Sequence, residues 1–190
     1  MLLGFAAVVV TAASKIAFIG WGIGWPEANF TGISGHAMFA TAVYPPLMCA
    51  LTARQARTGR RWATAAGGLI ALLVGMSRVE IGAHSISEVL AGWLVGGIAA
   101  IFPLAFSRWP REPISLVIPA AMTLWLLLTP GGVAALQTHS AVTRLALYLS
   151  GRDLPYTRDD MLRELRLRKG LVPTACPFAN DWLCAPPPKT

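Results

Sequence analysis

Long apolar stretches separated by short polar segments make up most of the chain up to residue 131. Charged residues are absent from 1–14, 62–77 and 89–107, and in 28–53 and 113–143 the only residue that could carry a charge at neutral pH is a histidine. A helix needs about 20 apolar residues to cross the hydrocarbon core of a bilayer. The pattern therefore predicts an all-α, polytopic transmembrane bundle with about five spans, at residues 2–24, 34–53, 63–79, 85–106 and 114–131.

Composition supports a membrane protein rather than a soluble bundle. Of 190 residues, 55% are hydrophobic and 13% are charged, whereas soluble domains have about 25% charged residues. Mean hydropathy is +0.56. The first charge, Lys15, follows the apolar start instead of preceding it, which is the reverse of a secretory signal peptide. Residues 2–24 are therefore expected to remain as a span.

The arginines predict how the bundle is oriented in the membrane. Arg-rich segments at 54–61 and 108–111 lie between predicted spans, and short loops rich in Lys and Arg usually stay in the cytoplasm. The connections near 27–33 and 80–85 would then face the opposite side, which is the periplasm if the protein lies in a bacterial inner membrane.

Residues 138–190 differ in character from the predicted bundle at 1–137, because they hold eight of the 16 Lys and Arg residues. Within this tail, 141–150 has the pattern of an amphipathic surface helix and 159–169 that of a short charged helix. Five spans would place the tail in the periplasm, where Cys176 and Cys184 could form a disulfide, and a metal site is less favoured because no histidine accompanies them.

The net charge of +7 raises the question of a nucleic-acid partner. The tail carries no nucleic-acid-binding motif. Orientation signals and contact with anionic lipid headgroups explain the excess of basic residues better. We therefore expect the bilayer and a lipid as partners, and no nucleic acid.

Polar and ionisable residues inside spans are costly and so indicate function. Those expected near the non-cytoplasmic side are Lys15, Ser34, Gly35, His36, Ser77, Arg78, His84 and Glu88. His84 and Glu88 are four residues apart, so they share one helix face and can form a hydrogen bond.

This set suits a phosphate ester. Arg78 and Lys15 could neutralise phosphoryl oxygens, and backbone N–H groups at Ser34-Gly35 could bind another at a helix N-terminus. One imidazole could attack phosphorus while a carboxylate orients it, and a second could protonate the leaving group.

The same residues resemble the signatures of the type-2 phosphatidic acid phosphatase superfamily. Ser77-Arg78-x5-His84-x3-Glu88 is similar to its third signature, Ser-Arg-x5-His-x3-Asp, and Ser34-Gly35-His36 to its second, Pro-Ser-Gly-His. In the first signature, Lys-x6-Arg-Pro, only Lys15 is matched, because Gly22-Ile23 stands where the family has Arg-Pro. Ile33 replaces the usual Pro, and Glu88 the usual Asp.

The resemblance implies a metal-independent lipid phosphatase that needs no cofactor and works through a phosphohistidine. It implies that His84 is the nucleophile, Glu88 its orienting acid and His36 the general acid. The phosphate ligands implied are Arg78, Ser34, Gly35 and Lys15, with Ser77 part of the same motif.

Two other functions remain open on the sequence. A non-catalytic membrane protein could use the same basic pocket to bind or move anionic lipids. A vanadate-dependent haloperoxidase shares the signatures, but such enzymes are normally soluble and the apolar spans argue against one.

Overall fold

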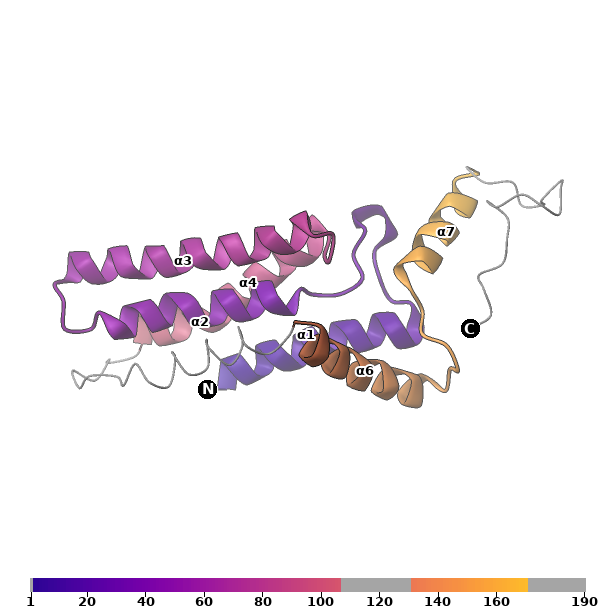
Figure 1. The fold of residues 1–190 in the computed structure, drawn as a ribbon, viewed down its shortest axis with the longest axis horizontal. Coiled ribbons are helices and arrows are strands. Elements are labelled where there is room, and N and C mark those ends of the chain that lie inside the picture. The colour runs from indigo at the N-terminus through magenta and orange to yellow at the C-terminus, as the bar shows by residue number, and fades with distance from the viewer. Residues whose placement is uncertain (1, 107–130, 171–190) are drawn as a thin grey trace.

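The computed structural model describes residues 2–106 and 131–170, and these are mostly helical. Along this part of the chain the elements are α1 (Leu2–Trp21), the 3₁₀ turn η1 (Pro26–Ala28), α2 (Gly35–Leu51), α3 (Arg57–Glu80), α4 (Ile86–Phe106), α6 (Gly131–Ser150) and α7 (Arg158–Arg168) (Figure 1). The predicted helical fold is confirmed. Three predictions fall outside the described residues: the span at 114–131 (except its last residue), the loop at 108–111 and the Cys176–Cys184 pair.

Helix α2 lies between α3 and α4 and packs closely against both (Figure 1). Glycines allow this close approach. A Cβ atom added at Gly92 of α4 would lie 2.7 Å from the Ser34 carbonyl oxygen, and one at Gly96 would overlap the Met38 carbonyl. A Cβ atom added at Gly67 of α3 would likewise lie 2.6 Å from the Tyr44 carbonyl oxygen. Small residues are common where membrane helices pack this closely.

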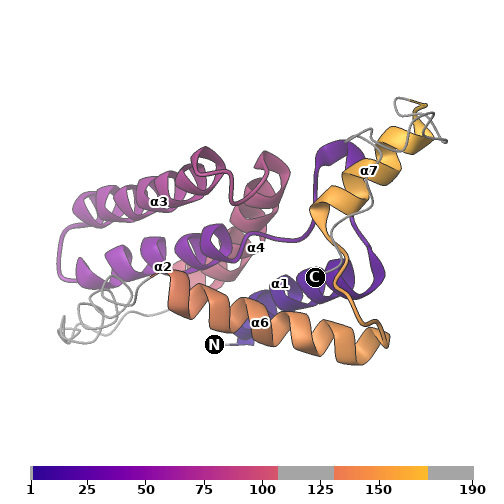
Figure 2. The ribbon, with the colours of Figure 1, turned by 45° about the vertical axis from the view of Figure 1, so that its right-hand side comes forward.

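Helix α1 connects this three-helix unit to the C-terminal helices. It contacts α2 and α4, and α6 lies alongside it (Figure 2). Ala146 of α6 is completely buried in a cluster with Phe18, Ile19 and Met161 of α7. Helix α6 runs without a break across the predicted boundary between residues 137 and 138, so the segment 141–150 is the second half of a longer helix that packs on α1.

The charged helix expected at 159–169 is confirmed as α7. Thr157 is its N-cap and forms a capping box with Asp160: the Thr157 side chain accepts from the Asp160 N–H, while the Asp160 carboxylate accepts from the Thr157 N–H at 2.9 Å. Arg166 and Arg168 lie in the last turn, where positive charge favours a helix. Met161 anchors the helix, because it is buried against the end of α1.

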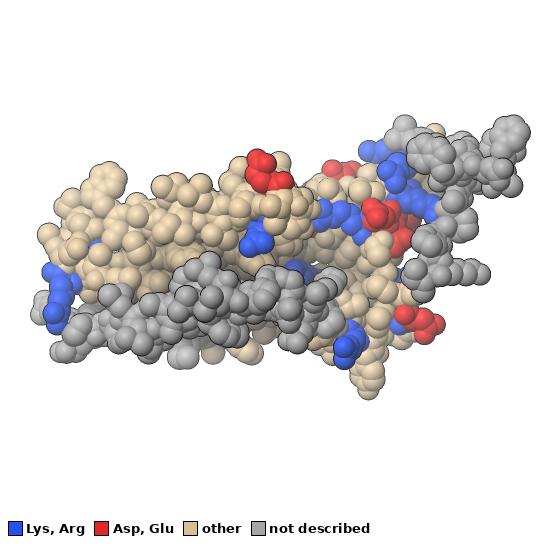
Figure 3. Space-filling view, in the orientation of Figure 1, with Lys and Arg blue, Asp and Glu red and all other residues tan. Residues whose placement is uncertain are grey.

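The surface of the bundle is suited to lipid. Helices α1 and α3 are long and apolar enough to cross a bilayer, and α4 contains a shorter apolar stretch, Ile86–Ile101. Large hydrophobic side chains on these helices are exposed, among them Phe5, Leu73, Leu94 and Ile98. On the face in Figure 3, charges gather at the ends of the bundle and leave an uncharged surface between them. Soluble monomers rarely expose apolar surface on this scale.

Candidate active site

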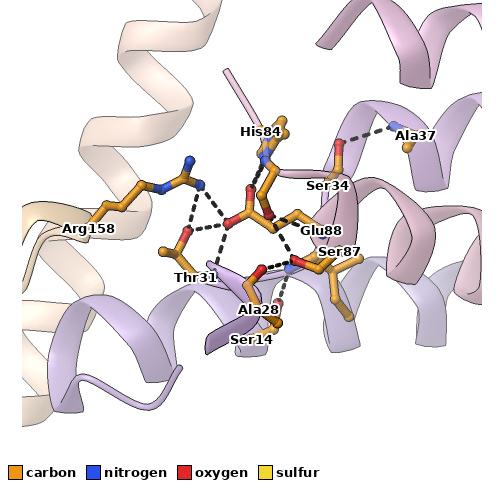
Figure 4. Close-up of polar contacts among 11 residues, drawn as sticks. Ser14, Ala28, Thr31, Ser34, Ala37, His84, Ser87, Glu88 and Arg158 are labelled. Atoms are coloured by element: carbon orange, nitrogen blue, oxygen red, sulfur yellow. Dashed lines mark hydrogen bonds and ion pairs between the residues drawn. The ribbon is translucent and has the colours of Figure 1, made fainter. Parts of the chain in front are cut away.

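Three of the residues predicted from sequence, Ser34, His84 and Glu88, lie together where the loop before α2, the α3–α4 turn and the start of α7 meet (Figure 4). The α3–α4 turn places His84. Gly82 takes a φ of 69°, which favours glycine, and the N–H groups of Ala83 and His84 both donate to the carbonyl of Arg78, at 3.0 and 3.2 Å. The chain therefore folds back on the last turn of α3 just before α4 begins.

His84 and Glu88 form the predicted contact. The His84 Nδ1 atom lies 2.7 Å from Glu88 Oε2, and the two side chains are 16% and 1% exposed. An imidazole that donates from Nδ1 to a carboxylate keeps its lone pair on Nε2. The contact therefore fixes a tautomer in which Nε2 of His84 is free to act as a nucleophile or base.

The Glu88 carboxylate is the centre of a hydrogen-bond network. Its Oε1 accepts from the Thr31 N–H at 2.8 Å, from the Thr31 hydroxyl at 2.5 Å and from Arg158 Nη2 at 2.7 Å. Its Oε2 accepts from His84 and, at 3.2 Å, from the Ser85 N–H. A buried charge is tolerated when it is paired and hydrogen-bonded. Both oxygens of Glu88 meet this condition.

Sequence reasoning missed two members of this network, Arg158 and Thr31. Arg158 comes from the first residue of α7 and its side chain is 30% exposed. Its helix was predictable, and the Thr157-x-x-Asp160 capping box marks where the helix starts. Nothing in the pattern indicates which of the tail arginines reaches Glu88, because that depends on how α7 docks.

A cavity of about 420 Å³ lies beside this network. One part of its wall is cationic or polar, with Lys15, His84, Thr31 and Arg158, and another part is apolar. The apolar wall consists of Phe18, Ile19, Pro155 and the ring of Tyr156. The cavity can therefore hold an anionic group that is attached to an apolar one.

Tyr156 contributes to this wall as a neutral group. Its ring meets Phe18 edge to face, with 5.5 Å between the centroids. Burial, together with a hydrogen bond to the Glu164 carboxylate and its charge, raises the pKa of Tyr156 to about 12. The phenol therefore stays protonated at physiological pH and adds no negative charge to the cavity.

His36 and Arg78 lie close to this centre but do not line the cavity. His36 occupies the first turn of α2 with an exposed side chain, within electrostatic range of Arg78, His84 and Lys15. Arg78 lies in the last turn of α3, and its Nε is a buried nitrogen without a hydrogen-bond partner among the described residues. Both residues are thus placed near His84, and the Arg78 Nε has donor capacity to spare.

The remaining predicted residues, Ser34, Gly35 and Ser77, take part in the local structure of their own helices. Ser34 is completely buried and caps α2, since its hydroxyl accepts from the Ala37 N–H at 3.5 Å. Gly35 is the first residue of that helix. Ser77 is exposed, and its hydroxyl donates to the Val74 carbonyl of its own helix at 2.8 Å, so the structure does not bring it into the cluster.

Comparison with known families shows the class of protein to which this helical bundle belongs. The model of the PAP2 superfamily matches residues 9–112, which is more than half of the chain, and the chain belongs to this superfamily. No solved structure matches it significantly.

Three relatives illustrate the range of the superfamily. An uncharacterized 22.5 kDa protein in the cps region of Klebsiella pneumoniae is 35% identical over 170 residues, which cover 86% of this chain and 80% of that protein. Phosphatidylglycerophosphatase B of Bacillus subtilis is 36% identical over 72 residues, covering 37% of this chain and 36% of that enzyme. Glucose-6-phosphatase 3 of Mus musculus is 34% identical over 112 residues, covering 52% and 32%.

These matches differ in extent. The alignments with the two phosphatases cover about a third of each enzyme. The similarity to the Klebsiella protein covers so much of this chain that it must continue beyond residue 112, into the C-terminal helices.

Proposed function

We propose that this protein is a membrane phosphatase that hydrolyses a phosphomonoester or pyrophosphate of a lipid through a phosphohistidine on His84. The observation that carries the proposal is the 2.7 Å contact between His84 Nδ1 and a buried carboxylate, at the wall of a cation-lined cavity. Two relatives within the superfamily are phosphatases by name, which supports the same class of reaction. The proposed chemistry uses no metal ion or cofactor.

In the first half-reaction, the lone pair on Nε2 of His84 attacks phosphorus and forms a P–N bond. The bond from phosphorus to the lipid oxygen breaks, and His36, as imidazolium, gives its proton to that leaving oxygen. Glu88 accepts the Nδ1–H bond throughout and stabilises the positive charge that develops on the His84 ring.

In the second half-reaction, water attacks phosphorus and the P–N bond breaks, which releases inorganic phosphate. His36, now neutral, takes a proton from the water as its oxygen bonds to phosphorus. Arg78 and Lys15 neutralise the charge on the phosphoryl oxygens, and the N-terminus of α2, which begins at Gly35, favours the same anion. Ser34 caps this helix, and its own N–H already donates to the Glu88 main-chain carbonyl at 3.0 Å. Ser77 stays a predicted member of the motif.

The proposed setting is a bacterial inner membrane crossed about five times, with the site facing the periplasm. The Arg-rich segment 54–61, at the connection between α2 and α3, and the α3–α4 turn that carries His84 lie at opposite ends of the bundle (Figure 1). A cytoplasmic Arg-rich loop therefore puts His84 on the far side. Phe18 and Ile19 extend the apolar surface of α1 into the cavity wall. A lipid could keep its chains along α1 while its phosphate enters the cavity. Phosphatidic acid, phosphatidylglycerophosphate, polyprenyl pyrophosphates and the phosphates of lipid A fit this description.

The test is phosphate release by the purified protein in detergent with EDTA present, against a panel of these lipid phosphates. We expect turnover by the wild type and none by His84→Ala. Full activity in His84→Ala, or strict dependence on a divalent ion, would contradict the mechanism. A wild type that binds lipid phosphates without turnover would instead favour a non-catalytic protein that binds or moves anionic lipids.

A further inference from the structure

The position where the first signature of the family has its arginine is a glycine here, in a conformation that disfavours any side chain. Six residues separate Lys15 from Gly22, and Gly22 follows α1 with a φ of 70°, a conformation that side chains other than glycine rarely adopt. A Cβ atom at this position would lie 3.2 Å from the ring of Tyr156. The C-terminal segment therefore covers the position from which that arginine would extend.

The same segment brings in another guanidinium. The Tyr156 N–H donates to the Ile19 carbonyl at 3.0 Å, and Thr157 caps α7. These contacts fix the backbone on both sides of the point where Arg158 begins. Its side chain extends toward Glu88 and Thr31 (Figure 4), with Nη2 lying 2.7 Å from Glu88 Oε1 and 3.3 Å from the Thr31 hydroxyl.

Arg158 is not used up by its bond to Glu88. A guanidinium carries five N–H donors in a fixed planar fork. Within the described part of the chain, both hydrogen bonds of Arg158 use Nη2. The side chain is 30% exposed and lines the cavity together with Lys15 and His84. Glu88 contacts both groups, so the Arg158 guanidinium and the His84 imidazole lie at the two oxygens of one carboxylate.

We propose that Arg158 is a phosphate-binding residue, supplying from α7 the guanidinium that the first motif lacks. This inference rests on the proposed function and completes its site. A tetrahedral phosphate placed in the cavity beside His84 would meet Lys15 and the unused N–H groups of Arg158, while Nη2 keeps its bond to Glu88. The ligand chemistry is a phosphate dianion, whether it belongs to a lipid headgroup or to free inorganic phosphate.

The experiment measures binding and turnover separately, on the full chain in detergent. Calorimetric titration with inorganic phosphate reports binding, and hydrolysis of phosphatidic acid in mixed micelles reports KM and kcat. Because Arg158→Gln loses a charge-assisted contact, we expect it to weaken phosphate binding about 10- to 100-fold. KM for the lipid should rise by a similar factor. Arg158→Lys should recover part of the phosphate affinity and part of the change in KM. Arg163→Gln, an exposed arginine on the same helix, should match the wild type.

A second background separates phosphate binding from mere neutralisation of Glu88. If Arg158 only balanced the buried carboxylate, its removal would cost nothing in phosphate affinity once Glu88→Gln has removed that charge. If Arg158 binds phosphate, the double variant should bind phosphate about 10- to 100-fold more weakly than Glu88→Gln alone. Equal affinity of these two proteins would overturn the inference, and so would wild-type affinity in Arg158→Gln.

Failure of the proposed function gives a different result. A wild type that hydrolyses no lipid phosphate but binds inorganic phosphate through Arg158 would refute the catalytic proposal and support the binding site. Normal turnover by the wild type, together with unchanged phosphate affinity in Arg158→Gln, would support the catalytic proposal and refute the role of Arg158. Affinity for phosphatidic acid without affinity for inorganic phosphate, unaffected by Arg158→Gln, would also refute the role of Arg158.

Discussion

Replacing Glu88 by glutamine tests the centre of the site without changing its shape. The carboxylate contacts donors at both oxygens: the Thr31 N–H and Arg158 at Oε1, and His84 and the Ser85 N–H at Oε2. An amide can accept at only one end. If its oxygen faces Thr31 and Arg158, its NH₂ group faces the imidazole and favours the tautomer with the proton on Nε2, which has no lone pair for attack on phosphorus.

The opposite amide orientation is no better, since it points the NH₂ group at Arg158 and the Thr31 N–H. Each buried donor left unpaired costs about 1–3 kcal/mol. In serine proteases, the change of the histidine-orienting carboxylate to an amide lowers kcat about 10⁴-fold. Because Glu88 has the same relation to His84, we expect Glu88→Gln to lower the rate of phosphoryl transfer by about 10²- to 10⁴-fold.

The assay is a single-turnover reaction with a radiolabelled lipid phosphate, quenched in alkali because a phosphohistidine is labile to acid. Label should accumulate on the wild type and form far more slowly on Glu88→Gln. Glu80→Gln is the matched control, an exposed carboxylate at the end of α3, and should behave as the wild type. A Glu88→Gln rate within about threefold of the wild type would refute the orienting role.

Four further outcomes follow from the structure. Glu88→Asp should lower kcat although the family usually has Asp here, because the shorter arm cannot contact both His84 and Arg158; equal activity would show that one of these contacts is dispensable. His36→Ala should slow hydrolysis of an alkyl phosphate about 10²- to 10⁴-fold but that of a nitrophenyl phosphate much less, and equal losses would exclude a general-acid role. A cysteine introduced by Arg57→Cys should resist a membrane-impermeant thiol reagent added outside cells, and its labelling would reverse the topology. Gly96→Val should unfold the protein at lower denaturant concentration, because its side chain would overlap the Met38 carbonyl; unchanged unfolding would mean that α2 and α4 are not held this close.

The hydrophobic pattern predicted the helices of the first half well, since charged loops separate them. The segment predicted at 34–53 is Gly35–Leu51, but the one at 63–79 is Arg57–Glu80. Hydropathy marks only the apolar part of a helix, whereas arginine is also a good helix former, so α3 continues into the Arg-rich segment.

From spacing alone, a specific contact in the site was predictable only between neighbours on one helix. The spacing of His84 and Glu88 is enough to predict their contact on a helix. Ser77 and Arg78 are adjacent, and adjacent helical residues point about 100° apart, so Ser77 is exposed while Arg78 has a buried Nε. The position of Arg158 in the site depends on the packing of Tyr156 against Gly22, and a local sequence pattern does not predict such a long-range contact.

The ion pair between Glu88 and Arg158 joins residues 70 positions apart, and this separation has a consequence for biosynthesis. Helices α1 to α4 leave the ribosome before α7 has been made. A growing chain could therefore insert and pack these helices while the Glu88 carboxylate still lacks its arginine. An unpaired buried charge is unfavourable, so this end of the bundle should remain loosely formed until α7 docks. Premature termination ahead of residue 158 would then leave inserted helices whose Glu88 carboxylate has no arginine partner from α7.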